Sequence, residues 1–187
     1  EAEGFRTLLA RIPAYQLNED GAVKEWMHPD IKDNYHHRHL SHIYPVFPGN
    51  EVTAHSRPAL FEAFKQAVRL RKLGSQSGWS LAHMASIYAR MGEGERSLGC
   101  LDVMAKSVVM NSLMTTHNDW RHMGMTLDLD SFAPVQLDAN FGAVNAIQEM
   151  IFCPQESALS FLPALPSRLA HGSARGLCFP EGTVDIL

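Results

Sequence analysis

Cysteine is scarce in this chain of 187 residues, and a strong excess of charge and long apolar runs are missing. Cys100, Cys153 and Cys178 are widely spaced and form no CxxC pair, so the sequence suggests neither a disulfide framework nor a zinc ribbon. No apolar run is long enough to cross a bilayer, and no signal-peptide pattern opens the chain. The formal net charge of -4 lacks the basic excess of nucleic-acid-binding domains. We expect free thiols and neither a membrane nor a nucleic-acid partner.

Two catalytic motifs are absent as well. The sequence has no GxSxG elbow, which argues against a hydrolase with a Ser/His/Asp triad. It has no HExxH pair, which argues against the zinc site of many metalloproteases. The hydrophobic content of 45% is ordinary for a globular protein, and the length suffices for one domain, or the larger part of one, with a real core. Both ends resemble interrupted elements, a helix at the start and a strand at 183–187.

Apolar residues recur mostly at helical spacing. A proline follows Ser56 and Arg57, and Ser77 precedes another periodic run, as expected at helix starts. The last periodic run places Phe141, Val144, Ile147 and Ile151 on one side, which we interpret as a packing face. Near the end, two short strand-like runs flank 180–182, as in a hairpin. The predicted helices cover about 4–12, 58–73, 78–91, 95–109 and 140–152. We therefore predict an all-α array followed by a small β-element.

The richest segment in hydrogen-bonding side chains is 36–50. Four histidines (His36, His37, His39 and His42) and Arg38 lie within seven residues, and two prolines follow. Because proline restricts the residue before it and removes a backbone donor, we expect an ordered extended loop. Neutral histidine both donates and accepts hydrogen bonds, and arginine offers a rigid fork of donors. The segment therefore suits a hydroxyl-rich or anionic ligand.

Two other interpretations of these histidines stand beside that one. They are scattered surface side chains, or they bind zinc, since His39 and His42 are three residues apart. A zinc site needs three or four ligands and supporting contacts, and no cysteine partner is nearby. We therefore expect no metal and no cofactor here.

A second polar group leads into the last predicted helix, with Gln136, Asp138 and Asn140 in five residues. Asp138 or Asn140 could simply cap the helix, since such residues are preferred there. Alternatively, the positive helix end keeps Asp138 ionised, as a base that activates water must be. Trp79 opens an earlier helix, where a core position is commoner than a ligand platform. The loop from Asn111 to Leu137 is long for a compact domain, which favours a functional role.

In order along the chain, these motifs resemble glycoside hydrolase family 95. The segments that carry the resemblance are Glu25-Trp26, 37–42, Tyr44-Pro45, 47–49, 78–80, 136–142 and 162–166. The family comprises α-L-fucosidases, chiefly acting on α-1,2-linked fucose, and some α-L-galactosidases. The resemblance implies that residues 1–170 form the C-terminal portion of an (α/α)6 catalytic barrel and that 171–187 begin a β-domain. It also implies a longer parent enzyme, extracellular or periplasmic.

The resemblance further implies an inverting mechanism, in which one carboxylic acid protonates the leaving oxygen while water attacks the opposite face of the sugar. Asp138 matches the aspartate that helps activate this water, and Arg38 and His39 match the pair that hydrogen-bonds the sugar. Gln136 and Asn140 support the site. The family's general acid and water-orienting asparagines lie in upstream motifs that these residues do not contain. Glu25 is the nearest substitute acid, and Ala139 stands where the family usually has glycine.

Three readings of function follow. The chain is a fragment of an inverting exo-fucosidase, inactive alone; a related α-L-galactosidase; or a non-catalytic carbohydrate-binding or interaction fragment. An open half-barrel would expose apolar faces, such as those carrying Phe64, Met84 and Met104. Because large apolar patches promote association, we expect the isolated chain to self-associate or to need an upstream partner.

Overall fold

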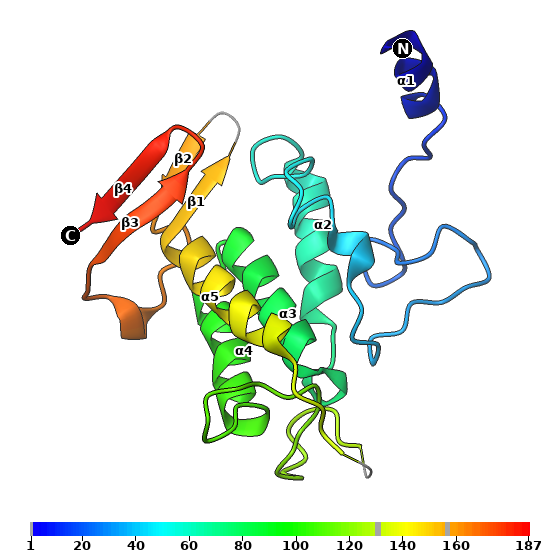
Figure 1. Cartoon of the computed structure of the whole chain (residues 1–187). Helices are drawn as coiled ribbons and strands as arrows, with labels where there is room; N and C mark the ends of the chain where they lie inside the picture. The colour runs from blue at the N-terminus through cyan, green and yellow to red at the C-terminus, as the bar shows by residue number, and fades with distance from the viewer. Residues whose placement is uncertain (1, 130–131, 156–157) are drawn as a thin grey trace.

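The computed structural model describes residues 2–129, 132–155 and 158–187, and it is mostly helical (Figure 1). The helices are α1 (Ala2–Leu9), α2 (Pro58–Arg69), α3 (Gly78–Arg90), α4 (Gly94–Ser107) and α5 (Leu137–Ile151). The strands are β1 (Phe152–Gln155), β2 (Ala158–Phe161), β3 (Ala174–Phe179) and β4 (Gly182–Ile186). The predominance of helices confirms the predicted class at this level, while the closed barrel stays a prediction. In the described ranges, no helix is long and apolar enough to span a membrane.

The helix boundaries follow the local sequence signals. Pro58 begins α2, a position where its missing N–H costs nothing. Before α3, the Ser80 hydroxyl accepts a hydrogen bond from the Ser77 N–H at 2.8 Å, which pairs a donor that the helix leaves free. Gly92 follows α3 with a φ of 74°, a left-handed conformation that glycine adopts without strain. The predicted ends of this helix are thus confirmed.

Helices α3 and α5 pack side by side in the same direction (Figure 1). Four pairs of residues lie along their contact: Gly78 with Ala139, Ala82 with Gly142, Ser86 with Asn145, and Arg90 with Glu149. A Cβ atom on Gly142 would lie 2.8 Å from the Cβ of Ala82, so the glycine permits the close approach of the two helices. Both helices therefore begin at the same end of the molecule.

This packing makes the predicted apolar face of the last helix wrong. Phe141, Val144 and Ile147 are 72%, 66% and 44% exposed, whereas Ala139, Ala146 and Met150 are buried. Both sets recur at helical spacing, and the sequence pattern favoured the larger side chains. The close approach to α3 occurs at small residues such as Ala139 and Gly142, which allow the two backbones to come near each other. The larger set forms an apolar stripe on the surface, which we call the α5 stripe.

The expected exposure of three other apolar residues is also wrong. Phe64, Met84 and Met104 are all buried in the core that α2, α3 and α4 share. Exposed apolar side chains lie instead on α5 and on α1. No residue of α1 is buried. In Figure 1, α1 stands apart from the other helices at the end of an extended segment.

Among the described residues, the strands form two antiparallel pairs. The β3–β4 pair, with Cys178 opposite Thr183, confirms the hairpin predicted at the end of the chain. The β1–β2 pair, with Phe152 opposite Phe161, was missed. Pro154 within β1 is unusual in a strand, so this run gave no strand signal. Both missed strands lie within 1–170, and the proposed domain boundary at 170 stays a prediction.

Candidate active site

One buried arginine holds the histidine-rich loop in place. Arg71 lies just beyond α2, with its side chain 1% exposed. Its Nη1 donates to the carbonyl oxygens of Asn34 at 2.7 Å and His37 at 3.1 Å. Its Nη2 donates to Glu25 Oε2 at 3.0 Å and lies 3.4 Å from His42 Nε2. The segment that carries Arg38 and His39 is therefore ordered by hydrogen bonds.

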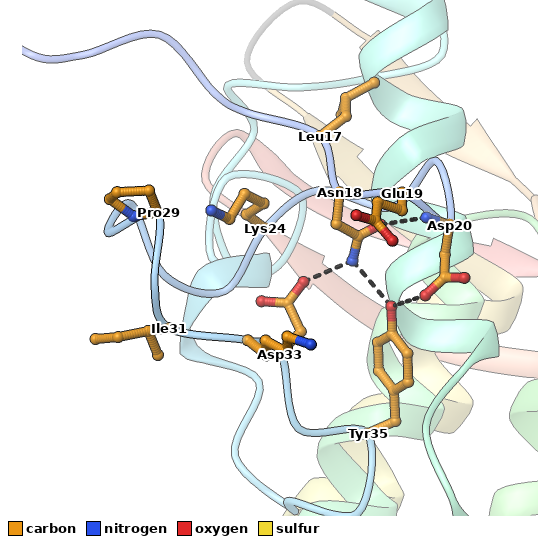
Figure 2. Close-up of a pocket in the computed structure, with 10 residues that line it drawn as sticks. Leu17, Asn18, Glu19, Asp20, Lys24, Pro29, Ile31, Asp33 and Tyr35 are labelled. Carbon is orange, nitrogen blue, oxygen red and sulfur yellow. Dashed lines mark hydrogen bonds between the residues drawn. The ribbon is translucent and has the colours of Figure 1, made fainter.

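Glu25 is held in turn by a network of polar residues. Its side chain is 7% exposed, and its N–H donates to Asp33 Oδ1 at 2.9 Å. Asn18 Nδ2 donates to Asp33 Oδ2 at 2.6 Å and to the Tyr35 hydroxyl at 2.9 Å. These last bonds lie around a pocket of about 390 Å³, in which Figure 2 shows Asn18 between Asp33 and Tyr35. Because its central polar groups bind one another, we interpret this pocket as support for the loop.

The side chains of the loop form a row of rings that reaches α3. The His37 ring stacks on the His39 ring, with centroids 4.7 Å apart and an angle of 21° between planes. The His39 ring lies edge-on to Trp79, with centroids 5.1 Å apart. His39 is exposed and Trp79 is half-buried in the first turn of α3. Trp79 thus lies against the sugar-binding candidate His39.

Gln136 joins the start of α5 to Trp79 at the start of α3. Its Oε1 accepts a hydrogen bond from the Trp79 N–H at 3.3 Å. The Gly78 N–H donates to the His117 carbonyl oxygen at 2.8 Å, so the long loop contacts the same helix start. A Cβ atom on Gly78 would lie 2.4 Å from the Thr116 carbonyl oxygen, which excludes any larger residue there. The starts of α3 and α5 are therefore joined through polar contacts.

Asn140 connects α5 to the long loop. Its Oδ1 accepts hydrogen bonds from the Thr115 N–H at 3.1 Å and from the Thr115 hydroxyl at 2.8 Å, while its Nδ2 donates to the Leu113 carbonyl at 2.8 Å. The Thr115 hydroxyl also donates to the carbonyl oxygen of Gln136. Asn140 thus supports the geometry of α5, and Thr115 is a supporting residue that the sequence analysis missed.

Asp138 is exposed in the first turn of α5. The predicted helix start at Asn140 is wrong by three residues, because α5 begins at Leu137 and Gln136 precedes it as the N-cap residue. Neither Asp138 nor Asn140 is therefore the N-cap. A carboxylate in the first turn is stabilised by the positive end of the helix. Ala139 lies inside the helix, is buried, and does not have a positive φ, so alanine is unstrained where the family usually has glycine.

The surroundings of His42 and His39 favour the neutral form of both rings. Burial and the positive charge of Arg71 together lower the pKa of His42 to about 4, against the opposing charges of Glu25 and Asp33. Burial also lowers the pKa of His39, as do the charges of His37 and Arg38, while Glu25 opposes them. A neutral His39 can both donate to and accept from a hydroxyl group. Arg38 is half-buried, and within the described ranges its Nε has no hydrogen-bond partner.

Trp79 connects the two groups of candidate residues, those of the loop and those at the start of α5. Trp79 contacts both His39 and Gln136, and Asp138 follows Gln136 by two residues. Among the residues that the structure describes, no hydrogen bond or ion pair joins Asp138 to Arg38 or His39. The same part of the chain contains no group of three or more histidine, cysteine or acidic residues that could hold a metal ion. The four histidines of the loop do not form such a group.

The sequence analysis missed Arg71, which holds the loop in place from just beyond α2. Arg71 follows the helical spacing of α2, and we had counted it with that helix, yet α2 ends at Arg69 and the side chain turns inward. Arg71 lies between Leu70 and Lys72, close to Arg69, so no local pattern indicated that its side chain is the buried one of these basic residues. Glu25 had been noted only as a substitute acid.

The chain was compared with known families and proteins. The glycosyl hydrolase family 95 catalytic domain matches residues 2–151. Alpha-L-fucosidase 2 of Arabidopsis thaliana is 30% identical over 182 residues, which cover 95% of this chain and 21% of that protein. Probable alpha-fucosidase A of Aspergillus oryzae is 27% identical over 187 residues, covering 89% of this chain and 25% of that protein. The chain thus spans a quarter or less of the length of these relatives. Because the family match covers most of the chain, the chain belongs to glycoside hydrolase family 95.

Proposed function

We propose that this chain contributes part of the active site of an inverting exo-glycosidase that removes terminal α-L-fucose, chiefly from α-1,2 linkages. The observation that carries the proposal is the contact of Trp79 with both His39 and Gln136, which brings the sugar-binding candidates to the start of α5, near Asp138. The names of the relatives, both α-fucosidases, support fucose as the sugar.

In this proposal Asp138 helps a water molecule attack the anomeric carbon. The carboxylate is exposed in the first turn of α5, so water can reach it. As the water attacks, its proton passes to the base, and the leaving oxygen takes a proton from an acid on the other side of the sugar. The two carboxyl groups of inverting enzymes are roughly 6.5–9.5 Å apart, which leaves room for the water.

Arg38 and His39 hold the sugar in this proposal. The Arg38 guanidinium donates to sugar hydroxyl groups, and neutral His39 donates or accepts. Removing a charged donor from a hydroxyl costs roughly 1.5–3 kcal/mol, so Arg38→Ala should weaken L-fucose binding by about one to two powers of ten. The variant should leave both limbs of the pH–rate profile in place, because Arg38 is neither acid nor base. Unchanged binding would contradict this role.

We propose that Glu25 is not the acid, because it is the partner of a buried arginine. Its Oε2 accepts a hydrogen bond from Arg71, and a proton on this carboxylate would remove the partner of a buried guanidinium. We therefore do not assign the proton donor to Glu25, and propose that the 187-residue chain alone hydrolyses nothing.

The test is an assay of 2′-fucosyllactose with the full-length product of the gene and, separately, with the 187-residue chain. We expect the full-length product to release fucose, with the β-anomer appearing first in the NMR spectrum, and the short chain to release none. Release by the short chain at a similar rate would contradict the assignment and make Glu25 the leading acid. Faster cleavage of an α-L-galactoside would favour the galactosidase, and sugar binding without hydrolysis by either protein would favour a binding module.

A further inference from the structure

Arg71 contacts the loop on both sides of Arg38 and His39, and Glu25 faces the ring of His37. Arg71 binds carbonyl oxygens at Asn34 and His37, immediately before Arg38 and His39. It also lies 3.4 Å from His42 Nε2, on the far side of the same two residues. A single side chain thus fixes the loop at three points around the proposed sugar-binding pair.

Glu25 has one oxygen left for a second contact. Its Oε2 is bound to Arg71, and its Oε1 lies 3.8 Å from His37 Nδ1. The His37 ring stacks on that of His39, which lies against Trp79. A continuous row of contacts therefore runs from the buried ion pair through His37 to His39.

An apolar pair would serve packing alone at least as well. Removing two charges from water is costly, and replacing a buried ion pair by apolar residues of similar size is often neutral or stabilising. Apolar side chains cannot, however, bind the two carbonyl oxygens or face the His37 ring with a carboxylate. The charged pair therefore fixes the orientation of the loop, which an apolar pair could not do.

We propose that Glu25 and Arg71 are positioning residues, which set the orientation of the His39 ring through His37. This proposal rests on the proposed role of His39 in sugar binding, but the orientation of the ring can be measured without a sugar. Glu25 and Arg71 touch no substrate in this scheme.

The test uses NMR spectra of the 187-residue chain, with L-fucose as the probe. We compare Glu25→Gln with Glu19→Gln, a nearby exposed acid without these contacts, visible in Figure 2. Glu25→Gln should shift the His39 ring signals and the Trp79 indole signal, lower the measured pKa of His39, and weaken L-fucose binding by about tenfold, the loss of one well-placed hydrogen bond. Glu19→Gln should change none of these. Ring signals of Glu25→Gln that coincide with those of the wild-type chain would overturn the proposal.

If Glu25→Gln fails to fold, variants of His37 test the same proposal. His37 is partly exposed, so His37→Ala should fold, and His37→Phe keeps a ring on His39 while losing Nδ1. We expect His37→Ala to shift the His39 signals and His37→Phe to restore most of the ring position. Where Glu25→Gln does fold, we combine it with His37→Ala. The double variant should lose no more L-fucose affinity than the weaker-binding single variant, because both residues act along one row of contacts. Additive losses of L-fucose affinity would overturn the proposal. His39 ring signals that do not shift in His37→Ala would also overturn it.

The proposed function and this inference fail in different ways. If the wild-type chain does not bind L-fucose, the sugar-binding role fails while the ring signals still test the positioning. If it binds L-fucose and Glu25→Gln binds equally well with unchanged ring signals, only the positioning role fails.

Discussion

The side-chain oxygen of Gln136 accepts a hydrogen bond from the backbone N–H of Trp79 at 3.3 Å, which joins the first turns of α5 and α3. The first N–H groups of a helix have no partner within the helix, so an acceptor from another element stabilises that end. Since His39 lies against Trp79 and Asp138 follows Gln136, this bond also relates the two parts of the proposed site.

Gln136→Ala should therefore destabilise the chain. The loss resembles that of a helix-capping side chain, about 0.5–2 kcal/mol of the free energy of unfolding. Urea unfolding of Gln136→Ala and of Gln148→Ala, a glutamine farther along α5, measures it. Equal losses in the two variants would show that the bond to Trp79 contributes nothing.

The close contact of α3 and α5 makes Gly142 sensitive to enlargement. A Cβ atom at Gly142 would lie 2.8 Å from the Cβ of Ala82, so Gly142→Ala should cost about 1–3 kcal/mol, as overpacked cores do. Gly99→Ala on α4 is the control, because nothing lies within 4 Å of its added Cβ, and it should stabilise by about 0.4–1 kcal/mol. A stabilising Gly142→Ala would contradict this packing.

His42 should make the fold less stable in acid. Its pKa is lowered to about 4, first by burial and then by the charge of Arg71. In the unfolded chain the pKa is about 6.5, so the unfolded state binds more protons between these values. Stability is therefore lost as the pH falls from about 6.5 to about 4, by up to about 3 kcal/mol.

Urea unfolding at pH 7 and pH 4.5 checks this expectation with His42→Gln and with the exposed His55→Gln as control. His42→Gln should lose less stability on acidification than the wild-type chain, and His55→Gln should lose as much. Some loss should remain in His42→Gln, because burial also lowers the pKa of His83. An equal loss in wild type and His42→Gln would be the contrary result.

The α5 stripe should promote association of the isolated chain. Phe141 and Val144 are both largely exposed, and contiguous apolar surface favours contacts between molecules. The double change Phe141→Ser and Val144→Ser should reduce association in sedimentation velocity, while Tyr44→Ser, an exposed aromatic residue outside α5, should not. Association that persists unchanged in the double variant would assign it to another surface.

Local signals in the sequence were sufficient to predict that these helices and the last hairpin exist, although the start of α5 was placed three residues too late. Pro58, Ser77 and Gly92 mark helix ends because their effect on the backbone depends on few neighbours. The buried face of α5 could not be predicted in the same way. Whether Phe141 or Ala146 faces inward depends on how closely α3 approaches, which is a property of the packed helices and not of the spacing.

The site was predictable only in part, for a similar reason. The motifs indicated Arg38, His39, Gln136, Asp138 and Asn140, and the structure shows the contacts of Gln136 and Asn140. The role of Arg71 depends on carbonyl oxygens at Asn34 and His37, and no side-chain pattern reveals where a carbonyl will point. The roles of Asp138, Arg38 and His39 in catalysis and binding stay predictions.

The most direct test of the proposed function is the turnover of Asp138→Asn in the full-length product of the gene. A general base contributes about 10²–10⁴-fold, so kcat on 2′-fucosyllactose should fall by that factor. The melting temperature should stay close to that of the wild type, because Asp138 is exposed and is not the N-cap of α5. Unchanged turnover with a lower melting temperature would contradict the proposal, and would reduce Asp138 to a charge that stabilises the start of α5.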